Sequence, residues 1–179
     1  MARKADPFLE SAIVNAAVRL LDKEGLEAVT MRDVAKAAGT TTPTLYERFS
    51  DRDALLVGVL EHIAQDIRAR MEATRSVKGI GEAFLGYCSE YPNRFNLIHR
   101  VWPPTLPSTR PRPTFQLTVE RLQSQYGHSF KQAQEIASAI MSILVGTSVF
   151  MLGSGANSKF ATRSRRIGMK AFEAVCKGI

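Results

Sequence analysis

Apolar residues recur at intervals of three and four along most of the chain, a spacing that predicts amphipathic α-helices. The first of these begins at Asp6-Pro7, an N-cap followed by a proline in the first helical position. It ends at Gly25, a residue suited to the left-handed position beyond a helix. Its inner face consists of Ile13, Ala16, Ala17, Leu20 and Leu21.

A second helix of barely two turns is predicted after Thr30. Thr30 can act as the N-cap, with Asp33 three residues later. Gly39 provides the left-handed residue that ends this helix. Its apolar face comprises Val34, Ala35 and Ala38.

A third short helix follows directly. Thr41 or Thr42 caps it, and Pro43 is tolerated in its first turn because the N–H group there has no helical partner. Leu45 and Phe49 fall four residues apart on the inner face. Two helices this short do not persist alone, so they need each other. The pattern is that of a helix-turn-helix, whose second helix faces the DNA major groove.

Longer helices make up the rest of the chain. Ser50 with Asp53 opens one that keeps an apolar stripe until about Arg75. Others are expected from about residue 79 to 102 with a break at Pro92, from 115 to 126, after the capping box of Ser129 and Gln132, and from about 158 to 176. We therefore predict an all-α fold, with a three-helix helix-turn-helix DNA-binding domain in residues 1–53 and a second helical domain in residues 54–179.

Residues 103–113 are too rich in proline for a helix or a central strand, and we predict a loop there. The loop is either a plain connector or a mobile cover over a ligand cavity.

Residues 136–158 carry no charge, and a stretch of that length can span a bilayer. Its many serines, its threonine and asparagine, and its glycines near the end argue against insertion. We expect a helix buried on most sides and no membrane partner. Ser138, Ser142 and Gly146 line one face with small residues, which permits close approach by another helix.

The last predicted helix has separate apolar and basic faces. We expect its apolar residues to point inward and its cations outward. The inward set is Phe160, Ile167, Ala171, Phe172 and Val175, and the outward set is Arg163, Arg165, Arg166 and Lys170.

Composition is ordinary for a globular protein of 179 residues, at 45% hydrophobic and 23% charged. The formal net charge is +7, but its location is unexpected. Residues 1–53 hold eight Lys/Arg and nine Asp/Glu, a balance of −1, whereas the remaining sixteen and eight give +8. DNA binding by the motif must therefore depend on where its few cations lie, rather than on net charge.

Cys88 and Cys176 stand alone, with neither disulfide-framework nor zinc spacing. A reduced, cytoplasmic location is the plain interpretation. The first twenty residues carry charges throughout and do not read as a signal peptide. We expect no metal and no cofactor.

Residues 25–56 carry a more specific signal: Thr44-Leu45-Tyr46, then Phe49, a charged cap and the pair Leu55-Leu56. This run resembles the tetracycline-repressor (TetR) family, closely over about a third of the chain and elsewhere only in architecture. The resemblance implies a homodimeric transcriptional regulator, by family habit a repressor, that binds a palindromic double-stranded DNA operator and is released by a small-molecule ligand. It makes residues 54–179 the helical ligand-binding and dimerisation domain. Whether the regulator represses or activates depends on where the operator lies.

The resemblance also implies contacts with DNA. Arg32 can bridge guanine O6 and N7, or can instead meet a phosphate or a surface carboxylate. Tyr46 matches the tyrosine with which the family contacts phosphate, and the alternative is packing within the domain. The whole predicted set is Arg32, Lys36, Thr42, Pro43, Thr44, Tyr46, Glu47, Arg48 and Arg52.

Three residues depart from the commoner family pattern. Thr40 replaces a valine, and Ser50 stands where a lysine is frequent. Glu47 has the largest consequence, because a carboxylate repels phosphates unless it accepts a hydrogen bond from cytosine N4 or pairs with a cation such as Arg48.

The family's last two long helices form its dimer interface, and the matching small or apolar positions here are Ser138, Ser142, Gly146, Ile167 and Ala171. A cavity for a small apolar or aromatic ligand can be assembled from Phe84, Tyr87, Phe95, His99, Trp102, Phe115, Met141 and Phe150. Aromatic and methionine side chains at helical spacing are also the ordinary content of a core, and this alternative stays open.

Enzyme motifs are missing: we find no phosphate-binding loop, zinc-protease or serine-hydrolase signature, and the three histidines lie far apart. We expect a protein that is not an enzyme. The remaining alternative is a helical protein-interaction or ligand-binding module that has lost DNA binding.

Overall fold

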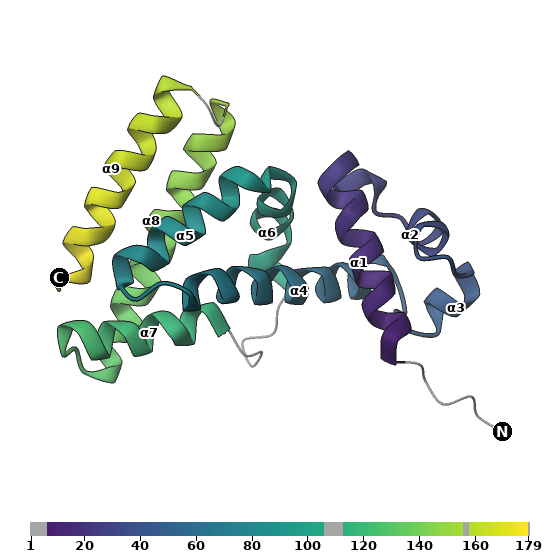
Figure 1. The fold of residues 1–179 in the computed structure, drawn as a ribbon, viewed down its shortest axis with the longest axis horizontal. Helices are drawn as coiled ribbons and strands as arrows, with labels where there is room; N and C mark the ends of the chain where they lie inside the picture. Colours follow the sequence, from purple (N-terminus) through teal and green to yellow (C-terminus); the bar gives the residue numbers. More distant parts are fainter. Residues whose placement is uncertain (1–6, 106–112, 156–157, 179) are drawn as a thin grey trace. The chain divides into compact units, whose positions relative to one another are not determined.

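The computed structural model describes residues 7–105, 113–155 and 158–178, and within them it is built from helices alone (Figure 1). This confirms the predicted all-α class. The elements are α1 (Pro7–Glu24), the 3-10 turn η1 (Leu26–Ala28), α2 (Met31–Ala37), α3 (Thr42–Tyr46), α4 (Arg52–Glu72), α5 (Val77–Glu90), α6 (Pro92–Thr105), α7 (Pro113–Tyr126), α8 (Phe130–Gly153) and α9 (Lys159–Cys176).

The chain forms two compact units. The head unit contains residues 1–63 and 93–106, and the body unit contains residues 64–92 and 107–179. This division differs from the boundary expected after residue 53, because the first half of α4 packs into the head core. A Cβ atom on Gly58 would lie 3.1 Å from the Phe49 ring and 3.5 Å from a Val14 methyl group.

The residues predicted to begin and end the short helices are confirmed. Thr30 Oγ1 accepts a hydrogen bond from Asp33 N at 3.1 Å and caps α2. Gly25 and Gly39 follow α1 and α2 with φ of 85° and 67°, values at which a side chain would strain the backbone. The predicted N-cap at Asp6 lies outside the described residues.

The start of α4 differs from the prediction. Asp51, rather than Ser50, caps this helix: its carboxylate accepts from Ala54 N at 2.8 Å, and Ser50 Oγ donates to it at 3.1 Å. The Ala54 amide first, and then the Ser50 hydroxyl, lower the pKa of the Asp51 carboxyl because they favour its charged form.

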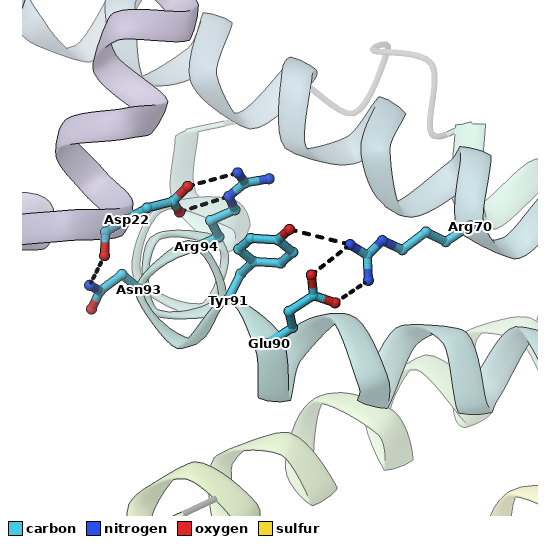
Figure 2. A network of polar contacts seen from close by, with 6 residues as sticks. All are labelled: Asp22, Arg70, Glu90, Tyr91, Asn93 and Arg94. Carbon is cyan, nitrogen blue, oxygen red and sulfur yellow. Dashed lines mark hydrogen bonds and ion pairs between the residues drawn. The ribbon is translucent and has the colours of Figure 1, made fainter.

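Within the head unit, the beginning of α6 is fixed to the end of α1 (Figure 2). Arg94 donates from Nε and Nη2 to the two carboxylate oxygens of Asp22, at 2.8 and 2.7 Å. Asn93 Nδ2 donates to the Asp22 carbonyl at 3.1 Å, which satisfies one of the carbonyls that a helix end leaves unpaired. Arg94 is buried while the Asp22 side chain is 30% exposed, and the two parallel hydrogen bonds to a carboxylate make this a strong, directional ion pair.

Within the body unit, Arg70 of α4 joins α5 (Figure 2). Its guanidinium donates to both oxygens of Glu90, at 2.6 and 3.2 Å, and to Tyr91 Oη at 3.4 Å. It also lies 5.0 Å from the centroid of the Tyr87 ring and 5.3 Å from that of Tyr91, within the range of cation–π attraction.

The close packing of α8 and α9 depends on Gly168, which is buried at their crossing. A Cβ atom there would overlap Thr147, lying 2.7 Å from its Cγ2 and 2.9 Å from its Cβ. Gly81 plays the same part for α5 and α9, since a Cβ atom would lie 3.1 Å from Phe172 and 3.2 Å from Met169. Glycines thus allow α9 to approach two neighbours closely.

The orientation expected for α9 was partly wrong. Phe172 is buried, but Phe160 and Ile167 are 53% and 50% exposed, and Ala171 is exposed as well. The helix turns a different stripe to the core, made of Ala161, Gly168, Met169, Phe172 and Cys176. The small residues Ala161 and Gly168 permit the close approach that bulkier side chains would prevent.

The loop predicted at residues 103–113 was wrong at both ends, because α6 continues through Pro103 and Pro104 to Thr105 and α7 begins at Pro113. Pro113 is well suited to the first position of α7, because the N–H group that proline lacks has no helical partner there. The remainder, residues 106–112, lies outside the described residues.

Helix α8 is long and apolar enough to cross a membrane by length and composition, the one such helix among the described residues. Its packing offers another explanation, because one face is buried in the body core. That face comprises Ala133, Ile136, Ala137, Ile140, Leu144, Thr147, Ser148 and Met151. The predicted capping box of Ser129 and Gln132 is present at its start.

Both cysteines are free and buried. Burial raises the pKa of Cys88 to about 12 and that of Cys176 to about 11. Because the thiolate is the reactive form, both side chains stay protonated and unreactive at neutral pH.

We expect Gly168→Ala to destabilise the body unit by about 1–3 kcal/mol, because the added methyl group forces Thr147 and the two helices apart. Chemical denaturation measures the change. Gly86→Ala is the matched control: a Cβ atom on Gly86 in α5 meets nothing within 4 Å, and alanine favours a helix, so it should be neutral or stabilising. Equal unfolding free energies for the two variants would contradict the role given to Gly168.

Candidate nucleic-acid interface

The helix-turn-helix of the head unit presents two cations on α2. Arg32 and Lys36 lie four residues apart, so they share one face, and both are exposed. Met31, Val34 and Ala35 occupy the opposite face and are buried. Burial of one face of α2 therefore holds these two cations outward.

Helix α3 has only five residues, and its first turn is secured by threonines. Thr41, one of the two candidates from sequence, is the N-cap: its Oγ1 accepts from Thr44 N at 3.3 Å and lies 2.9 Å from Thr44 Oγ1. Leu45 is completely buried and anchors the helix in the head core. A turn follows α3, and the Phe49 N–H donates to the Leu45 carbonyl at 3.0 Å.

The exposed surface of α3 is formed by Pro43, Tyr46 and Glu47, at spacings of three and four that place them on one face. The Tyr46 ring is 51% exposed and is therefore not part of the head core. Thr42, Thr44 and Arg48 are half-buried beside them.

Arg52 lies in a different environment from the other predicted DNA contacts. Its Nε donates to the Val29 carbonyl and its Nη2 to the Leu26 carbonyl, each at 2.7 Å. The guanidinium thus ties the start of α4 to the turn that precedes α2. A phosphate contact would have to break these hydrogen bonds, so we leave Arg52 out of the interface and treat it as a positioning residue.

Several carboxylates of the head are engaged internally. Asp33 accepts from the Thr30 hydroxyl at 2.6 Å, Asp51 caps α4, and Asp22 binds Arg94. Glu47, in contrast, makes no ion pair with Arg48 or another described residue. The placement of charge, rather than its sum, therefore leaves Arg32, Lys36 and Arg48 available at the surface.

The predicted ligand-cavity residues belong to two different units. Phe84 and Tyr87 are buried in the body unit, and Phe115 and Met141 are half-buried there. Phe95 and His99 belong to the head unit, where His99 is exposed and stacks on Phe95 with ring centroids 6.1 Å apart. The Trp102 side chain lies outside the described part of the structure.

Phe150 is 62% exposed and faces solvent instead of lining an interior. Its ring lies 6.4 Å from that of Phe160, which is exposed too. Together with Val149 and Ile167 they form what we term the α8–α9 apolar face. The predicted dimer positions Ser138, Ser142, Ile167 and Ala171 are exposed on these two helices, and Gly146 is half-buried. Sequence reasoning assigned Phe150 and Phe160 to the interior because exposed and buried apolar stripes have the same helical period.

Residues 13–59 match the model of the family described as bacterial regulatory proteins, tetR family. Among curated proteins, the chain is 29% identical over 90 residues to the HTH-type transcriptional repressor ComR of Escherichia coli. This alignment covers 49% of this chain and 43% of ComR. The chain is also 29% identical over 63 residues to the transcriptional regulator BetI of Rhizobium meliloti, covering 35% and 31%. The chain thus matches less than half the length of these relatives.

Solved structures share the fold along almost the whole chain. A TetR variant from Acinetobacter baumannii AYE, in complex with minocycline, superposes with a TM-score of 0.73 at 19% identity, covering 97% of this chain and 95% of that one. BioQ of Mycobacterium smegmatis gives 0.70 at 19% identity, covering 94% and 97%. The family model falls on the helix-turn-helix described above, so residues 13–59 form a DNA-binding motif of the TetR family, and the solved neighbours share the fold of the rest of the chain.

Proposed function

We propose that this protein is a sequence-specific transcriptional repressor that binds a palindromic operator in double-stranded DNA as a homodimer and is released by a small-molecule ligand. The observation that carries the proposal is the outward face of the helix-turn-helix, where the half-exposed ring of Tyr46 and the exposed Pro43 and Glu47 lie on a capped and anchored α3.

In this proposal α3 enters the major groove. Pro43 and the methyl groups of Thr42 and Thr44 approach base edges closely, where a thymine methyl group is their natural contact. Tyr46 donates its hydroxyl to a phosphate, which fixes the orientation of the head but carries no sequence information.

The charged residues divide between positioning and specificity. Lys36 and Arg48 neutralise phosphates, and Arg32 donates to a guanine edge or to a phosphate. Glu47 has no internal cation to pair with, so it either accepts from a cytosine amino group and selects that base, or it weakens binding to every sequence.

The α8–α9 apolar face supports the dimer. Val149, Phe150, Phe160 and Ile167 are each at least 40% exposed. Large apolar side chains gathered on one face mark an interaction surface, and a second copy of the chain is the partner that a two-fold operator requires. Two heads then reach half-sites about 34–36 Å apart, or at a related spacing.

The ligand belongs to the body unit in this proposal. Phe84, Tyr87, Phe115 and Met141 offer aromatic and apolar surface, which suits an apolar or aromatic small molecule. One solved relative was crystallised with minocycline, an aromatic compound. A DNA-binding regulator of this kind acts in the cytoplasm.

Selection from random-sequence duplexes at near-physiological salt tests DNA binding. We expect the wild type to enrich a two-fold symmetric site, and Tyr46→Ala to abolish enrichment because its side chain no longer reaches a phosphate. Tyr126→Ala is the matched control, since Tyr126 is also an exposed tyrosine, at 41%, but lies in the body unit.

If neither the wild type nor the Tyr126 variant enriches a site, the selection is repeated after unfolding and refolding to remove bound ligand. Continued failure would contradict DNA binding and favour a helical interaction module.

Arg32→Gln and Arg52→Gln remove the same charge from two different places. The dimer carries two copies of Arg32, so we expect Arg32→Gln to reduce the slope of log affinity against log salt by about 1.8, at about 0.9 for one phosphate in each half-site, or to change the preferred base. Arg52→Gln should weaken binding and lower the stability of the head while leaving the slope unchanged. Fluorescence anisotropy at several salt concentrations, together with thermal unfolding, measures both. A reduced slope for Arg52→Gln would show that its guanidinium meets phosphate after all.

The dimer is tested with Ile167→Glu, which places a charge in the α8–α9 apolar face. We expect dissociation to monomers in analytical ultracentrifugation and a loss of operator affinity of at least about tenfold. Ala73→Glu is the control, because it also replaces a neutral side chain with a negative one, at an exposed position outside that face. A dimer that survives Ile167→Glu unchanged would exclude this face as the interface.

A further inference from the structure

Helix α9 carries a row of four cations along its length. Lys159, Arg163, Arg166 and Lys170 are separated by four, three and four residues, so at about 100° per residue they lie within roughly 30° of one direction. All four are exposed. We call this set the α9 basic row.

The row is not neutralised within the described residues. None of the four side chains forms an ion pair or a hydrogen bond there, although the side chains of neighbouring cations do. Arg165 donates to Glu82 at 2.5 Å, and Lys78 pairs with Glu173 at 2.7 Å. Glu173 is the only carboxylate of α9, so the acidic groups nearest in the fold already have partners.

Within the body unit, the row faces away from the surfaces already assigned. By helical geometry it lies roughly opposite the buried stripe that contains Gly168 and Phe172, and about 90° from the exposed Phe160 and Ile167. A partner that covers the α8–α9 apolar face therefore leaves the row open along one border.

Charge accumulates in this part of the protein. Residues 54–179 carry an excess of eight positive charges, of which the row contributes four, whereas residues 1–53 carry a balance of −1. Residues 136–158, which precede α9 and include most of α8, carry no charge of either sign. A concentrated excess of this kind attracts polyanions from a distance and repels other cations.

We propose that the α9 basic row is a second DNA-binding surface, which contacts the phosphates of a duplex without regard to its sequence. The row extends over about 16 Å of helix at 1.5 Å per residue. It is linear and convex, so it matches an extended polyanion and not a small anion, which needs groups that converge. Duplex DNA presents about one charge per 1.7 Å of its axis, and Lys and Arg neutralise these charges with release of counterions.

The chemistry of the row also explains why this binding is independent of sequence. Base edges are distinguished by amide, carboxylate and correctly aimed guanidinium groups that reach into a groove. The four long, flexible and solvent-exposed cations of the row supply positive charge, but they are not held in a fixed orientation toward base edges. This surface goes beyond the proposed operator binding by the head and does not require it.

The experiment measures binding of the full-length protein to a 30-bp duplex of arbitrary sequence over a range of salt concentrations. Two double variants with the same net charge are compared: Arg163→Gln with Arg166→Gln in the row, and Arg75→Gln with Lys131→Gln at exposed positions outside it. The head is unchanged in both, so any difference between them reports the row. Thermal unfolding checks that each variant is folded, as expected for exposed positions.

We expect the row variant to reduce the slope of log affinity against log salt by about 1.8, at about 0.9 for each phosphate that is no longer neutralised, and the control to leave it almost unchanged. Replacing all four row residues with glutamine should reduce the slope by about 3.6. Equal slopes in the two double variants would overturn the proposal.

A second arm uses vesicles that contain phosphatidylglycerol. Binding to vesicles that depends on the row, with no effect of the row on the duplex, would replace DNA with an anionic lipid surface and would also overturn it. The two proposals can fail separately. If no symmetric operator is enriched but the row still determines the salt slope, operator recognition by the head is contradicted and the second DNA-binding surface is supported.

Discussion

The fold of the head unit depends on one small core in which its two shortest helices bury their apolar side chains together. Helix α2 has seven residues and α3 has five, and isolated helices of that length are unstable in water. Val34 and Leu45 are completely buried, and the first half of α4 closes the core from another side. The exposed residues of α3 therefore hold their positions only because the opposite sides of these helices are packed. Recognition of DNA would then be inseparable from the folding of the head.

Local chemistry made much of this predictable from sequence. Threonine caps, left-handed glycines and a capping box act within a few residues, so Thr30, Gly39 and Ser129 could be assigned without knowledge of the fold. Non-local contacts could not be assigned in this way. Arg52 resembled a surface cation, yet its partners are carbonyls more than twenty residues away, and hydrogen bonds to a backbone leave no signal in sequence.

The candidate sites show the same limit. A periodic apolar pattern indicates that a helix has an apolar face, but it does not indicate whether another helix of the same chain covers that face. Phe150, Phe160 and Ile167 therefore looked like core, although they are exposed on α8 and α9. Arg163, Arg166 and Lys170 were recognised as outward-facing from sequence. Their lack of partners became visible only when Glu82 was seen to bind Arg165 and Glu173 to bind Lys78.

The attachment of α6 to α1 has a consequence for the order in which the protein matures. Asp22 emerges early from the ribosome, whereas its partners Asn93 and Arg94 are among the last residues of the head unit to be made. At roughly 5–20 residues per second, the nascent head waits for several seconds with this part of its surface unpaired. The N-terminal unit is thus completed by a segment that arrives only after the first part of the body unit has been synthesised, so the two units cannot fold strictly one after the other.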